Sequence, residues 1–160
     1  NTNILTKILS KIKDLKIKLI VLQINNCHLC NLKSMENISQ NIKYLKLSHC
    51  NLYNIESLNK ILRHNIKYVC LTNNNINNED LDYLHKINCN YLNLNGNKIS
   101  DPYSLVYMLQ NNKNLRYVNL LNNDIDFDPL ISDEMFELNI SFQLDHIAIW
   151  NAAHIPTWNP

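Results

Sequence analysis

The stretch IKYVCLTNNNI, residues 66–76, decides the fold, because the chain contains four more copies of its pattern. These copies cover residues 19–29, 42–52, 89–99 and 115–125, and successive copies begin 23 to 26 residues apart. Each copy has eleven positions. Positions four, six and eleven hold aliphatic residues, position one holds an aliphatic residue or Cys, and position nine holds Asn or Cys. Such a period indicates stacked repeats that share one continuous core.

The pattern L-x-x-L-x-L-x-x-N/C-x-L resembles the signature of leucine-rich repeat proteins, and the chain is similar to their intracellular type. The resemblance implies an α/β solenoid, a short horseshoe of about five to six repeats with a parallel β-sheet on its concave face. We expect a single domain over residues 1–160. Within it, an N-terminal cap helix covers 1–18, five repeats cover 19–125, and a degenerate repeat with an irregular cap covers 126–160.

Both ends of the stack are expected to need covers, because the outermost repeats would otherwise expose apolar core. Residues 3–17 predict an amphipathic helix whose apolar positions are Ile4, Leu5, Ile8, Leu9, Ile12 and Leu15. A basic amphipathic helix can also bind acidic membranes or calmodulin-like partners, but we favour the cap. At the other end, a sixth strand and its cover are predicted from Leu144, Ile147, Ile149, Trp150 and Trp158.

Short helices are predicted between the copies, on the outer face of the solenoid. Apolar residues at helical spacing mark one helix over residues 56–64 and another after Asn78. A longer third helix is expected to begin at Ser100 or Asp101, with Pro102 in its first turn.

The five cysteines are predicted to be thiols rather than disulfides. Cys27 and Cys50 occupy position nine, whose side chain points inward, and Cys89 occupies position one. None of the five belongs to the paired clusters that close the ends of secreted repeat proteins. We therefore expect an intracellular protein, either cytoplasmic or nuclear, in a reducing compartment.

Catalytic and metal chemistry are not expected. A phosphate-binding loop needs several glycines, and the chain has one, Gly96. Zinc could be suggested by the Cys and His residues at 27–30 and 49–50, but four ligands must converge on the metal. The register turns Cys27 and Cys50 inward and His28 away. No nucleophile lies in an activating motif, so we predict no enzyme activity, cofactor, metal or small-molecule substrate.

The residues between the inward positions are predicted to form a binding surface, because strand side chains alternate between two faces. Position three is Tyr in four consecutive copies, and neighbouring strands lie about 4.8 Å apart, so the rings should pack together. Tyr and Arg often carry binding energy at interfaces. The predicted partner-binding residues are Tyr44, Tyr68, Tyr91, Tyr117, Lys43, Lys46, Lys67 and Arg116. Alternatively, the tyrosines only stabilise the sheet.

The leading interpretation is a non-catalytic adaptor that binds a protein through this concave, Tyr-lined face. No apolar run approaches the ~20 residues that a membrane-spanning helix needs, so no membrane partner is expected.

The charge is unevenly distributed along the chain. Residues 1–78 carry 11 Lys and Arg against 3 Asp and Glu, whereas residues 79–160 carry 4 Lys and Arg against 11 Asp and Glu. The molecule should therefore be a dipole with a basic start and an acidic end.

The alternative is an RNA- or ribonucleoprotein-associated subunit. Residues 52–125 resemble the repeat domain of nuclear mRNA-export receptors. The comparable features are the return segment over 52–64, the short copy ending in residues 95–97, and the longer helix before Leu115. Spliceosomal repeat proteins share this resemblance. In this alternative, the tyrosines stack bases, while Lys43, Lys67, Arg116 and the basic N-terminal helix neutralise phosphates.

Overall fold

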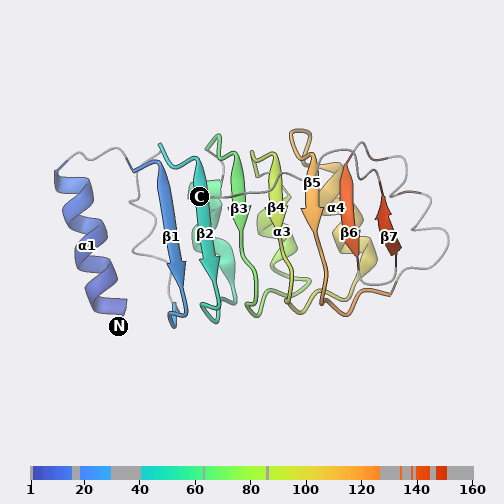
Figure 1. Cartoon of the computed structure of the whole chain (residues 1–160), viewed down its shortest axis with the longest axis horizontal. Coiled ribbons are helices and arrows are strands. Elements are labelled where there is room, and N and C mark those ends of the chain that lie inside the picture. The colour runs from blue at the N-terminus through green and yellow to red at the C-terminus, as the bar shows by residue number, and fades with distance from the viewer. Residues whose placement is uncertain are drawn as a thin grey trace.

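A computed structural model describes residues 2–15, 19–29, 41–62, 64–85, 87–126, 134, 138, 140–144 and 147–150. Seven strands form one sheet in sequence order (Figure 1). They are β1 (Val21–Asn25), β2 (Tyr44–Ser48), β3 (Tyr68–Cys70), β4 (Tyr91–Asn93), β5 (Tyr117–Asn119), β6 (Ser141–Leu144) and β7 (Ile147–Trp150). Strands β1 to β6 are parallel, and β7 is antiparallel to β6. The predicted parallel repeat sheet is confirmed.

The strands pair in the register that the repeats predict. Each position of one copy lies beside the same position of the next, so Leu45 pairs with Leu22 on one side and Val69 on the other. Leu45 and Val69 are fully buried, as are Leu92 and Val118 in the following copies. The aliphatic side chains of neighbouring copies therefore form one continuous core, and burial of that apolar surface stabilises the stack.

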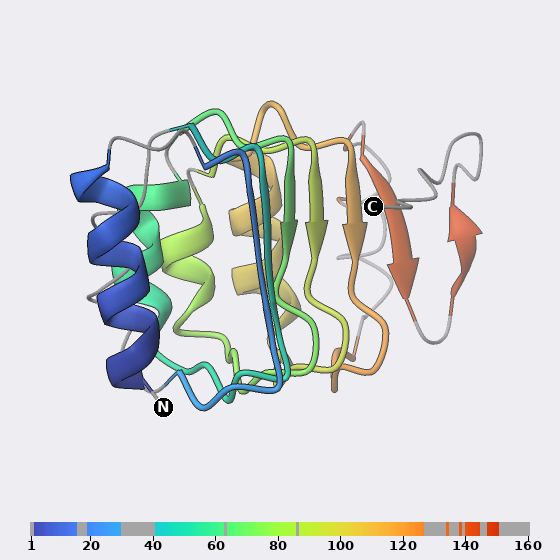
Figure 2. The same cartoon turned by 60° about the vertical axis from the view of Figure 1, so that its left-hand side comes forward.

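Short helices lie on one face of the sheet, and the opposite face, which we call the concave face, carries none of them (Figure 2). They are the 3₁₀ helix η2 (Ile55–Leu58), α2 (Asn59–Leu62), α3 (Leu81–Leu84) and α4 (Pro102–Gln110). The helix predicted over 56–64 is thus a 3₁₀ turn that continues into one α-helical turn. The predicted start of α4 is confirmed, because the Asp101 side chain accepts hydrogen bonds from two backbone N–H groups of its first turn.

The Asn side chains at position nine connect each repeat to the one before it. Asn97 Oδ1 accepts a hydrogen bond from Ile76 N at 3.1 Å, and its Nδ2 donates to Leu71 O at 3.0 Å and Leu94 O at 2.8 Å. Asn74 and Asn123 make equivalent contacts. The inward orientation expected for position nine is confirmed, and the Asn side chains satisfy backbone groups that would otherwise be buried without partners.

Where position nine is Cys, the main chain takes over part of this role. The Cys50 thiol donates to Ile24 O and Ser48 O at 3.5 and 3.3 Å, but the N–H of Leu29 donates to the backbone oxygen of Cys50 at 3.0 Å. In later copies the N–H equivalent to that of Leu29 donates to an Asn side chain instead. Cys therefore replaces the donor function of Asn, and a backbone carbonyl supplies the acceptor.

Position eight adopts a left-handed backbone conformation in all five copies. Its φ is +67° at Gly96 and +53° or +54° at Asn26, His49, Asn73 and Asn122. Apart from Gly, Asn is among the residues that adopt this conformation most readily. Asn thus allows this turn to form in three of the five copies, in a chain with one Gly.

The N-terminal helix α1 (Thr2–Asp14) lies beyond β1, at the end of the sheet (Figure 1). Leu9 is buried in the core and Ile12 packs against it, as a cap requires. However, Ile4, Ile8 and Leu15 are at least half exposed, which contradicts a single inward stripe. At 100° per residue these three share a face that adjoins the one occupied by Leu9 and Ile12, so only part of the apolar surface reaches the core.

The C-terminal end departs from the prediction of one sixth strand around residues 144–149. The structure has the parallel strand β6 followed by the antiparallel strand β7, and Phe142 takes the inward position beside Val118. Trp150 belongs to β7, whereas Trp158 and most of the acidic segment before β6 lie outside the described residues. No helix in the described part of the chain has both the length and the apolar character needed to cross a membrane.

Candidate functional site

The predicted tyrosines lie on four adjacent strands in perfect register. Tyr44, Tyr68, Tyr91 and Tyr117 are successive strand partners. The ring of Tyr91 stacks on that of Tyr68 with a centroid distance of 4.4 Å and on that of Tyr117 at 4.6 Å, with interplanar angles of 14° and 12°. The parallel register brings these rings to the spacing of the strands themselves. We call this row the tyrosine column.

The tyrosine column is only partly displayed. Tyr44, Tyr68 and Tyr91 are half-buried, but Tyr117 is only 4% exposed, in contrast to the expectation that all four rings face the surface. Strand β6 lies next to β5 and places Ser141 in register with Tyr117, so this ring is no longer at the edge of the sheet. Tyr44, Tyr68 and Tyr91 therefore contribute most of the accessible surface of the tyrosine column.

Burial raises the pKa of three hydroxyl groups in the column, those of Tyr68, Tyr91 and Tyr117. It is the main cause that raises the pKa of Tyr91 to about 12, with a further contribution from the nearby Tyr117 and Cys70. Burial also raises the pKa of Tyr68 and of Tyr117 above the usual value. The phenol groups of Tyr68, Tyr91 and Tyr117 are therefore neutral at physiological pH and can both donate and accept hydrogen bonds.

The basic residues at position two lie where the strands begin. Lys67 and Arg116 are exposed, and Lys43 is half-buried with its Nζ donating to Asn65 O at 2.8 Å. One guanidinium nitrogen of Arg116 donates to Lys113 O and to Leu115 O, both at 3.0 Å. These contacts hold Lys43 and Arg116 beside the tyrosine column, with Lys67 between them in the sequence of repeats.

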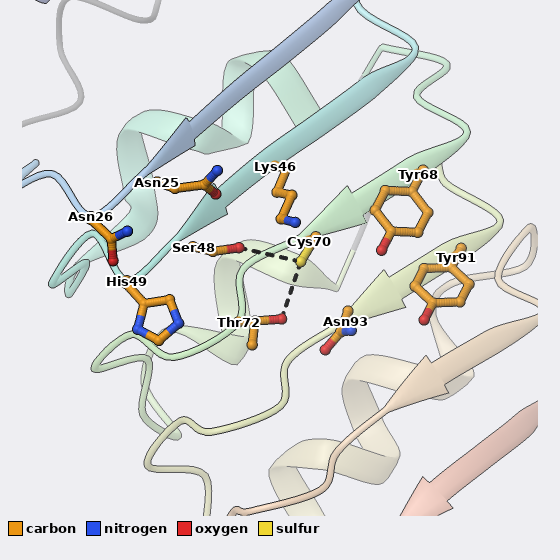
Figure 3. A pocket seen from close by; sticks show the side chains of 10 residues that line it. All are labelled: Asn25, Asn26, Lys46, Ser48, His49, Tyr68, Cys70, Thr72, Tyr91 and Asn93. Atoms are coloured by element: carbon orange, nitrogen blue, oxygen red, sulfur yellow. Dashed lines mark hydrogen bonds between the residues drawn. The ribbon is translucent and has the colours of Figure 1, made fainter. Parts of the chain in front are cut away.

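A hollow of about 560 Å³ lies on the concave face, between the tyrosine column and the carboxyl ends of the strands (Figure 3). Cys70 lies in its floor and is only 4% exposed. Its thiol is 3.6 Å from Ser48 Oγ and 3.1 Å from Thr72 Oγ1. The lining residues are Asn25, Asn26, Lys46, Ser48, His49, Tyr68, Cys70, Thr72, Tyr91 and Asn93. The hollow thus combines aromatic edges with many polar side chains.

Sequence reasoning missed several residues of this hollow. Ser48 and Thr72 occupy position seven, and His49 occupies position eight, where its Nε2 lies 2.9 Å from Asn73 Nδ2. Position seven lies on the same face as positions three and five, because strand side chains alternate. Extending the alternation by one step would have placed Ser48 and Thr72 on the concave face.

The described residues hold no group of three or more His, Cys, Asp and Glu side chains arranged for a metal ion. Of the residues considered for zinc, Cys50 is buried, Cys27 is half-buried, and His28 and His49 are exposed. Cys30 lies outside the described residues. Burial raises the pKa of the Cys50 thiol, and it raises that of Cys89 to about 12, so both are protonated thiols.

No protein-family model matches the chain, and no curated protein matches it. Solved structures do resemble it. An internalin C2 from Listeria monocytogenes has a TM-score of 0.58 at 24% identity, covering 86% of this chain and 66% of that one. An internalin (inlF) from the same organism has a TM-score of 0.59 at 17% identity, covering 84% and 45%. A chain of the mouse RP105/MD-1 complex has a TM-score of 0.51 at 23% identity, covering 71% and 18%.

The present chain therefore spans at most 66% of the length of each of these proteins. At sequence identities of 17% to 24%, the likeness to these structures shows a shared fold only. The five copies of the pattern, the parallel sheet in sequence order and the likeness to these structures show together that this chain has the leucine-rich repeat fold.

Proposed function

We propose that this chain is a non-catalytic interaction scaffold whose concave face binds a segment of a partner protein. The observation that carries the proposal is the tyrosine column, in which Tyr91 is stacked between Tyr68 and Tyr117. The rings are already ordered by the sheet and by one another, so binding would cost little side-chain entropy. Half-buried tyrosines beside exposed basic groups are also typical of residues that dominate protein interfaces.

The arrangement favours a protein over RNA as the partner. Proteins that bind single-stranded RNA stack bases on the free faces of aromatic rings. Both faces of the Tyr91 ring are covered by neighbouring tyrosines at 4.4 and 4.6 Å, which leaves no room for a base between them. The column offers ring edges and hydroxyl groups instead, and these suit the backbone and polar side chains of a peptide.

Affinity capture from the native lysate, read out by mass spectrometry, tests this proposal with a matched pair of variants. Y68S+Y91S removes two rings from the concave face. Y103S+Y107S removes two exposed tyrosines from α4, which lies on the other side of the sheet. We expect the wild type and the α4 variant to retain the same partner and the concave variant to lose it.

Circular dichroism would establish that both variants are folded before capture is compared. Recovery of the same protein by Y68S+Y91S at the wild-type level would refute binding through the concave face. Loss of the partner from the α4 variant alone would place the interface on the helical face instead.

We further propose that the protein works in a reducing, intracellular compartment. Cys27, Cys50, Cys70 and Cys89 are free thiols, and Cys50, Cys70 and Cys89 are buried. Thiols persist where glutathione and thioredoxin keep them reduced. Localisation of the tagged native protein by microscopy would test this, and its appearance in the secreted fraction would refute it.

A further inference from the structure

We propose that the hollow beside Tyr68 and Tyr91 is a carboxylate-binding site that takes an Asp or Glu side chain of an extended, acidic partner peptide. This inference rests on the proposed function and specifies which chemistry the concave face recognises. It is carried by two independent observations, the set of polar groups around the hollow and the distribution of charge over the concave face.

The hollow gathers hydrogen-bond donors from three adjacent strands. Lys46 and Ser48 belong to β2, Tyr91 belongs to β4, and Thr72 follows β3 by two residues. Figure 3 shows the ammonium group of Lys46 directed toward the centre of the hollow and the hydroxyl of Tyr91 on the same side as Asn93. A carboxylate has two oxygens that together accept about four hydrogen bonds, so it can use several of these donors at once.

Charge at four positions of the repeated pattern has one sign. In the five copies, positions two, three, five and seven comprise twenty residues, and these include the four cations Lys43, Lys46, Lys67 and Arg116 but no Asp or Glu. The whole chain, by contrast, has 15 Lys and Arg against 14 Asp and Glu. No carboxylate belongs to the described residues that line the hollow. A partner with negative charge would therefore find complementary charge and little repulsion along these positions of the five copies.

The spacing suits an extended peptide. Position two precedes position five by three residues, which corresponds to about 10 Å along a strand. An extended peptide that places one carboxylate near Lys46 can thus present another, about three residues away, to the basic residues where the strands begin. A volume of about 560 Å³ also leaves room for the main chain beside the carboxylate. Such pairing would fix both the register and the direction of the bound segment.

Fluorescence anisotropy with a labelled decapeptide of alternating Glu and Asp residues tests the site directly. A decapeptide of alternating Gln and Asn and a ten-nucleotide oligouridylate serve as comparison probes. We expect the acidic peptide to bind, the amide peptide to bind at least tenfold more weakly, and the oligouridylate to bind no better than the amide peptide.

Two variants with a matched control locate the binding. K46A removes the ammonium group from the hollow, and Y91F removes one hydroxyl while keeping the stacked ring. K98A removes an exposed Lys from position ten, outside the hollow. We expect affinity for the acidic peptide to fall about tenfold in K46A and about threefold in Y91F, with no change in K98A.

Equal losses in K46A and K98A would overturn the proposed site, because they would indicate attraction by charge alone. Equal binding of the amide and acidic peptides would also overturn it, although binding that still depends on Tyr68 and Tyr91 would leave the scaffold function intact. Tighter binding of the oligouridylate, lost in K46A, would replace the peptide with nucleic acid. Failure of all probes, with partner capture still sensitive to Y68S+Y91S, would reject the acidic chemistry alone.

Discussion

Removal of a single position-nine side chain should destabilise the whole stack. In Asn97→Ala, Ile76 N–H loses its acceptor, and the carbonyls of Leu71 and Leu94 lose a donor at 3.0 and 2.8 Å. Asn97 is only 7% exposed, so water cannot readily replace these bonds. At about 1 kcal/mol of net stability for each hydrogen bond, three bonds correspond to a loss of about 3 kcal/mol.

Urea unfolding followed by circular dichroism would measure this loss through linear extrapolation. Asn97→Cys should cost about half as much as Asn97→Ala, since a thiol can still donate, as Cys50 does at the same position. The control is Asn90→Ala, which removes an exposed side chain with one bond to Asn114 O at 3.2 Å and should cost less than about 0.5 kcal/mol. A cost of N97A equal to that of N90A, or of N97C as large as that of N97A, would refute the reasoning.

Three further changes test other parts of the structure. Asp101→Ala removes the N-cap of α4 and should lower the free energy of unfolding by about 1 kcal/mol, together with the melting temperature. D101N can still accept hydrogen bonds from the backbone N–H groups of the first turn, so it should lower the melting temperature less. Gly96→Ala should lower the free energy of unfolding by about 1–2 kcal/mol, because φ is +67° and the new Cβ meets Asn73 Oδ1. Adding Asn73→Ala should recover part of this free energy, and the midpoints of urea unfolding would measure both changes. The pKa of Tyr91 is about 12 in the folded state and near 10 in the unfolded chain, so the unfolded chain loses this proton first as the pH rises. The free energy of unfolding should therefore decrease between these two pH values, and it should decrease less in Tyr91→Phe, which has no proton to lose there.

Much of this architecture could be predicted because the repeat pattern fixes register. Once Tyr44 and Tyr68 occupy the same position of successive copies, parallel pairing places them side by side. The burial of Tyr117 could not be predicted in this way, because it depends on β6. In the strand register, position one of that sixth copy falls on Asn139 rather than on an aliphatic residue, so the pattern is not recognisable there.

The hollow was beyond prediction for a different reason. Alternation can place Ser48 and Thr72 on the concave face, but the depth of a surface depends on the sizes of side chains from several strands together. Small side chains at Ser48, Cys70 and Thr72 leave space next to the larger Lys46 and Tyr68. The amphipathic helix raises a similar difficulty, since apolar spacing indicates that a face is buried but not how wide the covering surface is.

Each repeat is held by contacts that reach only its immediate neighbour, as the bonds from Asn97 to the preceding repeat illustrate. A molecule assembled in this way can change size by whole units. One additional unit would lengthen the sheet by about 4.8 Å and could supply one more ring to the row, with every existing contact unchanged. Evolution or protein engineering could thus adjust, one repeat at a time, the length of the partner segment that the sheet contacts, without redesigning the hydrophobic core.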